Sequence, residues 1–161
     1  MNQPDKSLVD ALLAMAHSRK PIKTSLIYQL SEMGESDATQ VRMIWPTLLI
    51  DRRITLLARL AESASNDFQA DYFAIGEIAL EDEDSEVRSL AIKLLWETES
   101  VEILTRFLDM AQGDANLALR SIAVSALGRV IYLAETEDFS PPLRQAVEHA
   151  LIDVAGNEAL P

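Results

Sequence analysis

The sequence contains no cysteine, only 5 glycines and 6 prolines among its 161 residues, and only 6% aromatic residues. Without cysteine the chain can form no disulfide, no thiolate zinc site and no catalytic thiol. The shortage of turn-forming and aromatic residues disfavours a β-sandwich, in which many short strands alternate with Gly- and Pro-rich turns. An all-α fold built on Leu, Ala, Ile and Glu is the expectation that remains.

Positive charge is also scarce. The chain has 14 basic and 26 acidic side chains and a formal net charge of −12. Nucleic acids and anionic membranes bind clustered positive charge, so neither is expected as a partner. No basic segment leads into an apolar run, and no run approaches the roughly 18 apolar residues of a spanning helix. These missing signals predict a cytoplasmic protein.

The apolar residues that are present follow a helical period. Residues 84–97 carry apolar side chains at the spacing i, i+3, i+4, i+7 and i+8, which predicts a helix with one buried face. These side chains are Val87, Leu90, Ala91, Leu94 and Leu95. Asp84 or Ser85 is the expected N-cap, because both can accept a hydrogen bond from the first-turn amides.

The same pattern returns 32 residues later, in residues 114–134. The paired positions are Val87 with Leu119, Arg88 with Arg120, Ala91 with Ala123, and Leu95 with Leu127. An internal period of this length indicates a repeat protein, in which stacked units share a continuous core.

Seven further helices are predicted from period and capping signals, at residues 7–17, 21–33, 37–49, 51–63, 68–80, 101–112 and from 141 to about 156. Pro21 is expected as the first residue of its helix and Gly34 as its stop, and Pro46 should kink or split the next one. Phe68 and Tyr72 are expected on an apolar face. We predict one domain over residues 1–161, made of four antiparallel pairs and an unpaired ninth helix. The chain is then either part of a longer stack, or a second copy covers Ala146, Val147, Ala150, Leu151 and Val154.

Two segments resemble HEAT repeats. The pattern of Asp82, Asp84, Val87, Arg88, Ala91 and Leu95 looks like the second half of such a repeat. A weaker echo is formed by Asp114, Leu119, Arg120, Ala123, Leu127 and Gly128. The sequence is similar to HEAT-repeat (armadillo-like) proteins, in particular to small bacterial ones of unassigned function. The resemblance implies a short right-handed α-solenoid of about nine helices.

Several residues could have either a functional role or a structural one. In HEAT-like proteins the residue matching Arg88 and Arg120 bonds carboxylates and carbonyls of the inter-helix loops; here the candidates are Asp82 and Asp84, or Asp109 and Asp114. A calcium loop needs a glycine for its sharp turn, and the run Glu81-Asp82-Glu83-Asp84 has none. These side chains are therefore expected to be solvated and to cap the following helix. Trp45 and Trp96 are expected to seal the core between repeats more than to anchor a partner.

No catalytic, cofactor-binding or metal-ligating residue is predicted. His17 and His149 lie near opposite ends of the chain, and neither has a second histidine at i+3 or i+4. No nucleophile triad, phosphate loop or His-Glu-x-x-His motif is present. The sequence therefore predicts a non-enzyme without a cofactor.

The remaining candidate is a surface on the second helix of each pair. In HEAT-like stacks this layer usually forms the concave side, and its polar positions would make a ridge of small hydroxylated side chains with cations. The candidate partner-binding residues are Thr55, Arg59, Ser89, Lys93, Ser121, Ser125 and Arg129. A plain solvated helix face is the alternative for the same residues.

Charge is unevenly distributed along the chain. Residues 1–61 hold 8 basic and 6 acidic side chains, a net charge of +2, whereas residues 62–102 hold 2 and 12, a net charge of −10. Such an acidic region would attract a protein partner with a basic segment. The alternative is acidic charge kept for solubility.

The function expected is a non-enzymatic protein–protein interaction or scaffold module that binds its partner on the second-helix surface. One alternative is a purely structural self-assembling subunit, with a homo-oligomer formed through the C-terminal helix. Another is a HEAT-like lyase or isomerase acting on bound tetrapyrroles, for whose propionates only Arg59, Lys93 and Arg129 qualify. HEAT-like proteins that excise damaged DNA bases need a basic stripe, which the net charge of −12 contradicts.

Overall fold

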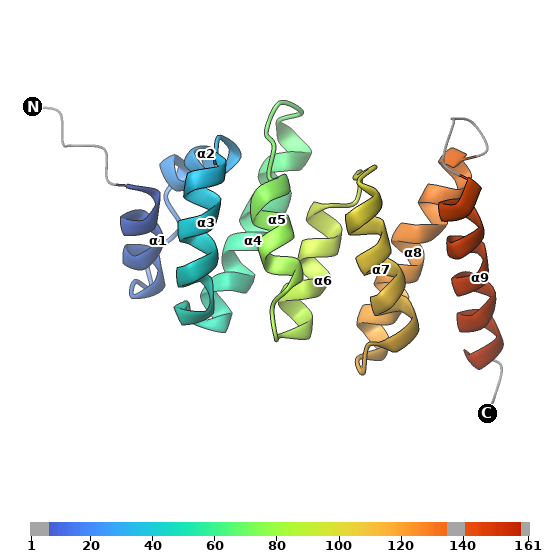
Figure 1. The fold of residues 1–161 in the computed structure, drawn as a ribbon. Helices are drawn as coiled ribbons and strands as arrows, with labels where there is room; N and C mark the ends of the chain where they lie inside the picture. The colour runs from blue at the N-terminus through green and yellow to red at the C-terminus, as the bar shows by residue number, and fades with distance from the viewer. Residues whose placement is uncertain (1–6, 135–140, 159–161) are drawn as a thin grey trace, which may run out of the picture. The chain divides into compact units, whose positions relative to one another are not determined.

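The computed structural model describes residues 7–134 and 141–158, which contain nine α-helices, one short 3₁₀ helix and no strand. The predicted all-α class and the number of helices are confirmed. The chain divides into two compact units, residues 1–95 and 96–161, which are described separately below (Figure 1). The prediction that the whole chain is one domain stays a prediction.

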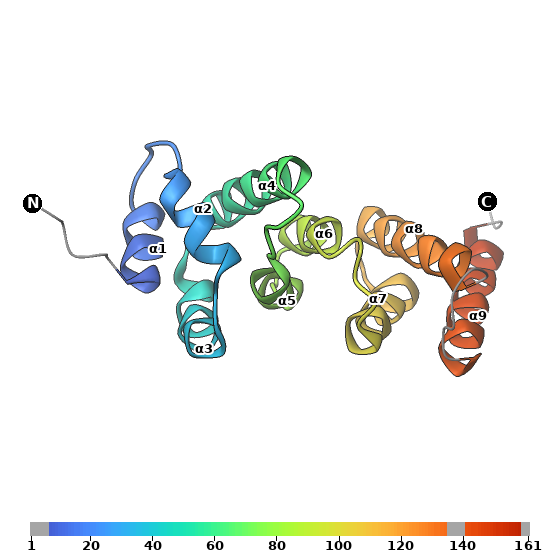
Figure 2. The ribbon, with the colours of Figure 1, turned by 90° about the horizontal axis from the view of Figure 1, so that it is seen from above.

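Unit 1 consists of three successive helix pairs. Its helices are α1 (Leu8–Ala16), α2 (Thr24–Ser31), α3 (Glu35–Ile44), the 3₁₀ helix η1 (Trp45–Thr47), α4 (Ile50–Asn66), α5 (Phe73–Leu80) and α6 (Ser85–Leu94). Within this unit, Figure 2 shows α3 and α5 in one layer and α4 and α6 in the other. Helix α6 packs against both α4 and α5, so its apolar stripe is enclosed on two sides.

The core of unit 1 is built from the predicted helical stripes. Val87, Ala91 and Leu95 are buried, as the spacing predicts, whereas Leu90 and Leu94 are half-buried. The N-cap prediction is also confirmed, because the Asp84 side chain accepts hydrogen bonds from the backbone amides of Glu86 and Val87. The largest fully buried side chains of this unit are Leu12, Leu30, Leu48, Leu56, Leu57, Leu60, Ile75, Leu80 and Ile92.

Two helix boundaries differ from the prediction. Pro21 does not begin α2, which starts at Thr24, because the chain stays extended while it places Ile22 in the core. Gly34 does not stop α2; it is the N-cap of α3, with φ −82° and ψ 175°. Pro46 splits its segment as expected, and α3 gives way to η1 at Trp45 because proline lacks the amide that the next helical turn needs.

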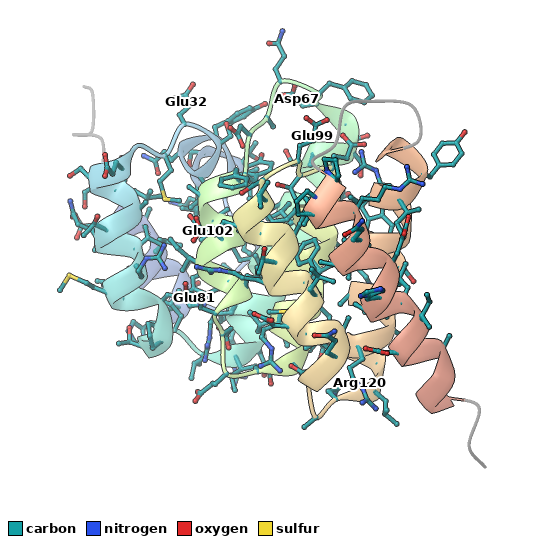
Figure 3. All side chains as sticks on the ribbon, turned by 45° about the vertical axis from the view of Figure 1, so that its right-hand side comes forward. Glu32, Asp67, Glu81, Glu99, Glu102 and Arg120 are labelled. Atoms are coloured by element: carbon teal, nitrogen blue, oxygen red, sulfur yellow. The ribbon has the colours of Figure 1, made fainter. Side chains whose placement is uncertain are left out.

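The prediction for Phe68 was wrong. This residue lies in the connection between α4 and α5, next to Asp67 (labelled in Figure 3), and is 98% exposed. Helix α5 begins only at Phe73, and Tyr72 before it is buried. The Tyr72 hydroxyl is hydrogen-bonded to the Ser63 hydroxyl at 2.9 Å, so the buried ring closes the α4–α5 connection and Phe68 stays outside it.

Unit 2 consists of one antiparallel helix pair and a third helix. These are α7 (Val101–Gly113), α8 (Leu117–Ala134) and α9 (Pro141–Glu158). Helix α8 begins 32 residues after α6, as the period predicts. Ile103, Leu104, Phe107 and Leu108 of α7 are buried, whereas Val101, the first residue of this helix, is exposed.

Helix α9 was predicted to have no partner in the chain, but it packs against both α7 and α8. Val147 and Ala150, two of the residues expected to meet a second copy, are fully buried inside this unit. Ala146 is exposed and Leu151 is half-buried; the side chain of Val154 lies outside the described residues. The apolar stripe of α9 therefore completes the core of its own unit.

The glycines at the middle of two helices allow a stability prediction. A Cβ added at Gly76 of α5 would lie 2.8 Å from both Cδ2 and Cγ of Leu95, whereas one at Gly128 of α8 would meet no atom within 4 Å. We expect Gly76→Ala to destabilise unit 1 by about 1–3 kcal/mol through overpacking. Gly128→Ala should instead stabilise α8 by about 0.5–1 kcal/mol, because alanine is the better helix former. Denaturant unfolding in dilute solution measures both, and equal shifts of the same sign would contradict the prediction.

Candidate functional site

In unit 1 the predicted surface residues lie on α4 and α6, the two neighbouring helices of one layer (Figure 2). Thr55 and Arg59 lie one turn apart on α4, and both are exposed. Ser89 and Lys93 lie one turn apart on α6, where Ser89 is half-buried and Lys93 is exposed. The structure therefore places these four predicted residues on two adjacent helices.

In unit 2 the predicted residues lie on α8. Ser121 and Ser125 are exposed, whereas Arg129 is half-buried. One Arg129 guanidinium nitrogen donates to the carbonyl oxygen of Trp96 at 3.1 Å, within the same unit. Arg129 thus holds the segment that leads into α7, and only part of its side chain remains accessible.

Three of the candidate hydroxyls are already used as donors. Thr55 donates to the carbonyl of Asp51, Ser89 to that of Ser85 and Ser125 to that of Ser121, at 2.7, 2.8 and 2.9 Å. A serine or threonine hydroxyl has one proton and two lone pairs, so these groups meet a partner as acceptors. Arg59 is similarly engaged, since it pairs with Glu62 at 2.6 Å, although this exposed ion pair adds little stability.

The arginine matching the HEAT pattern has the predicted structural role in unit 1. Arg88 donates to the carbonyl oxygens of Asp82 and Glu83, at 2.8 Å each, and so ties the start of α6 to the preceding turn. Charge-assisted bonds of this kind are stronger than neutral ones. Arg120, at the equivalent position of α8, is half-buried (Figure 3). Its pairing with Asp109 or Asp114 stays a prediction.

The acidic run is only partly the solvated capping charge that the sequence suggested. Glu81 and Glu83 are exposed, but Asp82 is buried and forms an ion pair with the buried Arg53 of α4, with Nη1 and Oδ2 2.5 Å apart. Trp45 Nε1 donates to the same oxygen at 2.7 Å. The other carboxylate oxygen of Asp82 accepts from the backbone amide of Asp84 at 2.9 Å.

This Trp45–Arg53–Asp82 cluster joins η1, α4 and the turn before α6. It confirms that Trp45 packs in the core, where the residue is 3% exposed. The Nε atom of Arg53 is buried without a hydrogen-bond partner, so the cluster is not fully satisfied. Sequence reasoning missed the pair, because a buried carboxylate in a run of four acidic residues has no local signal.

Two exposed or half-buried arginines also serve to link helices of unit 1. Arg42 on α3 bonds Glu81 at 2.9 Å and lies 3.9 Å from Glu77, both beyond its own helix pair (Glu81 is labelled in Figure 3). Arg52 donates to the carbonyls of Met15 and Lys20, which fastens α4 to the segment after α1. Cations that bond protein carbonyls and carboxylates in this way are part of the packing between repeats.

The described residues contain no group of three or more His, Cys, Asp or Glu side chains placed to hold a metal ion. His17, at the end of α1, and His149, on α9, are both exposed. Trp96 is half-buried in unit 2. Among the helices of the described part of the chain, none has the length and apolar character needed to cross a membrane.

These features define a helix-pair repeat protein: antiparallel pairs, a 32-residue period from α6 to α8, and an arginine that bonds the preceding turn. A family model for HEAT repeats matches residues 74–160, more than half of the sequence. The chain belongs to the HEAT-repeat family. No curated protein and no solved structure matches it.

Proposed function

We propose that the chain is a non-enzymatic scaffold whose second-helix faces, on α4 and α6 in unit 1 and on α8 in unit 2, bind a protein partner. The observation that carries the proposal is membership of the HEAT-repeat family, whose repeats are generally protein-interaction modules. Stacked repeats present extended faces that can bind a partner without a deep pocket.

The geometry of unit 1 supports the choice of face. Thr55 and Lys93 are exposed on adjacent helices and point away from the buried stripes that hold the unit together. Arg59 is exposed and pairs with Glu62 on the same helix. Substituting these side chains therefore changes the surface without removing a core contact, which makes them suitable for a binding test.

Charge favours a partner with a basic segment. The region from residue 62 to 102 carries a net charge of −10, and many of its carboxylates are exposed, including those of Glu62, Glu83 and Glu86. Such a field accelerates the encounter with a basic protein and is weakened by salt. Thr55 and Ser89 add hydroxyl acceptors for the donors of such a segment.

The test is affinity capture from a lysate of the source organism with a charge-reversed face. Glu62→Lys/Glu86→Lys, on exposed positions of α4 and α6, is compared with wild type and with Glu32→Lys/Glu35→Lys, a control of equal charge change on exposed residues at the end of α2 and the start of α3. Reversing the acidic charge of the face should repel a partner with a basic segment. We expect one protein to be retained by wild type and control, and at least ten-fold less by the face variant. Equal retention by all three chains, or no specific retention, would contradict the proposal.

A further inference from the structure

The connection between α4 and α5 exposes an aromatic side chain almost completely. Phe68 lies in this connection, which forms the upper end of unit 1 in Figure 1, and it is 98% exposed. The other large apolar residues described as exposed range from 38% to 76%. Burying a phenylalanine side chain is favourable by about 1.5–3 kcal/mol, and folding of this chain leaves that free energy unused. Aromatic side chains are enriched where proteins bind one another.

The connection is ordered on both sides of Phe68. The Asp67 side chain accepts a hydrogen bond from the backbone amide of Gln69 at 3.0 Å. The Asp71 side chain accepts from the backbone amide of Phe73 at 2.8 Å. Because the backbone around Phe68 is already fixed in this way, a partner that binds the ring would have little backbone freedom to remove, which lowers the cost of binding.

Two carboxylates flank the exposed ring, one residue before it and three residues after it. Asp67 and Asp71 are both exposed, and each uses its Oδ1 atom for the amide bond just described. Within the described part of the chain, the Oδ2 atom of neither residue has a hydrogen bond or an ion pair. Carboxylate oxygens form strong, charge-assisted bonds with Lys and Arg side chains. These two atoms can therefore accept bonds from cations of a partner.

The charge of the surrounding sequence favours one class of partner. No Lys or Arg occurs between Arg59 and Arg88, and these two arginines are themselves bonded, to Glu62 and to the turn before α6. Nucleic acids, anionic membranes and a second copy of this chain, with its net charge of −12, would be repelled. A protein surface that carries Lys or Arg would be attracted.

We propose that Phe68 is an anchor that inserts into an apolar pocket of a partner protein, and that Asp67 and Asp71 pair with Lys or Arg side chains at the rim of that pocket. An apolar centre within a polar rim is the usual arrangement of a protein interface. The anchor lies in the α4–α5 connection, outside the helix faces of the proposed function, and does not depend on them.

The first test is photochemical cross-linking of the intact chain in a lysate of the source organism. Phe68 is replaced by the photoreactive analogue p-benzoylphenylalanine, and the cross-linked peptides are identified by mass spectrometry. The matched control carries the same analogue at Tyr28, an exposed aromatic residue of α2. We expect one protein to be cross-linked at least ten-fold more from position 68, at a segment that contains both apolar and basic side chains.

The second test measures the Kd of the identified partner with purified variants. Phe68→Ala should weaken binding at least ten-fold, whereas Tyr28→Ala should leave the Kd unchanged. Asp67→Asn/Asp71→Asn should also weaken binding at low salt and reduce its salt dependence, because the charge is lost. Asparagine keeps the Oδ1 acceptor, so the backbone bonds of the connection are retained. Far-UV circular dichroism establishes that each variant is folded.

The outcomes separate this inference from the proposed function. Cross-linking from position 68 that does not exceed the control, or that reaches only a second copy of the chain or a lipid, overturns the anchor. A Kd that neither Phe68→Ala nor the neutralised variant changes overturns it as well. If Glu62→Lys/Glu86→Lys captures the same proteins as the wild type while Phe68 passes both tests, the proposed α4 and α6 face is wrong and the anchor is supported.

Discussion

Replacing Ala91 with Asp is expected to unfold unit 1. Ala91 is 0% exposed on α6, which packs against α4 and α5, so the new carboxylate would be buried without a partner. Burying an unpaired charge costs several kcal/mol, a large part of the roughly 5–15 kcal/mol that stabilises a whole domain. Thermal unfolding followed by circular dichroism should show a large loss of helical signal at temperatures where the wild type is folded.

The matched variants make this result specific. Ala123→Asp, at the equivalent buried position of α8, should affect unit 2 in the same way. Ala58→Asp places the same carboxylate on the exposed side of α4 and should change the free energy of unfolding by no more than about 0.5 kcal/mol. A melting temperature of Ala91→Asp equal to that of the wild type would mean that the assigned register of α6 is incorrect.

The second large effect is expected from Asp82→Ala. This substitution removes the carboxylate that pairs with Arg53 and accepts from Trp45, and it leaves the Arg53 charge buried. Breaking a buried ion pair by removing one partner costs about 3–5 kcal/mol. Chemical denaturation should show this loss of stability in the unfolding transition of unit 1, because the cluster joins η1, α4 and the turn before α6.

The controls use the neighbouring carboxylate and the partner cation. Glu83→Ala, in the same turn but exposed, should cost at most about 0.5 kcal/mol. Adding Arg53→Met to Asp82→Ala should recover part of the loss, because the uncompensated charge is then removed. Equal costs for Asp82→Ala and Glu83→Ala, or a further loss in the double variant, would show that the ion pair does not account for the stability of this turn.

The residues that stabilise unit 1 and the residues proposed to bind a partner are different ones. The arginines and carboxylates that bond across helices, Arg42, Arg52, Arg53 and Arg88, hold unit 1 together. The residues proposed to bind a partner are those that this network leaves at the surface. Helical spacing determines which side chains are exposed, but not what those side chains bind. The sequence alone could therefore place Thr55, Arg59 and Lys93 on a face but could not identify a partner.

The sequence by itself determined the helices, their period and the residues that repeat. The burial of Val87 and Ala91 and the cap at Asp84 depend on neighbours within one or two turns, and these were predicted from the residue pattern. The bonds of Arg88 to the preceding turn were expected from the resemblance to HEAT repeats. The 32-residue period likewise placed Ala123 in the core of α8.

Only the tertiary structure decided which elements those helices would meet. Phe68 is exposed because Tyr72 closes the connection instead, and Val147 is buried because α9 packs on α7 and α8. Asp82 is buried because Arg53, 29 residues earlier in the chain, lies opposite it. Periodicity is a local property of the backbone, whereas burial and ion pairing depend on which distant segments the fold brings together.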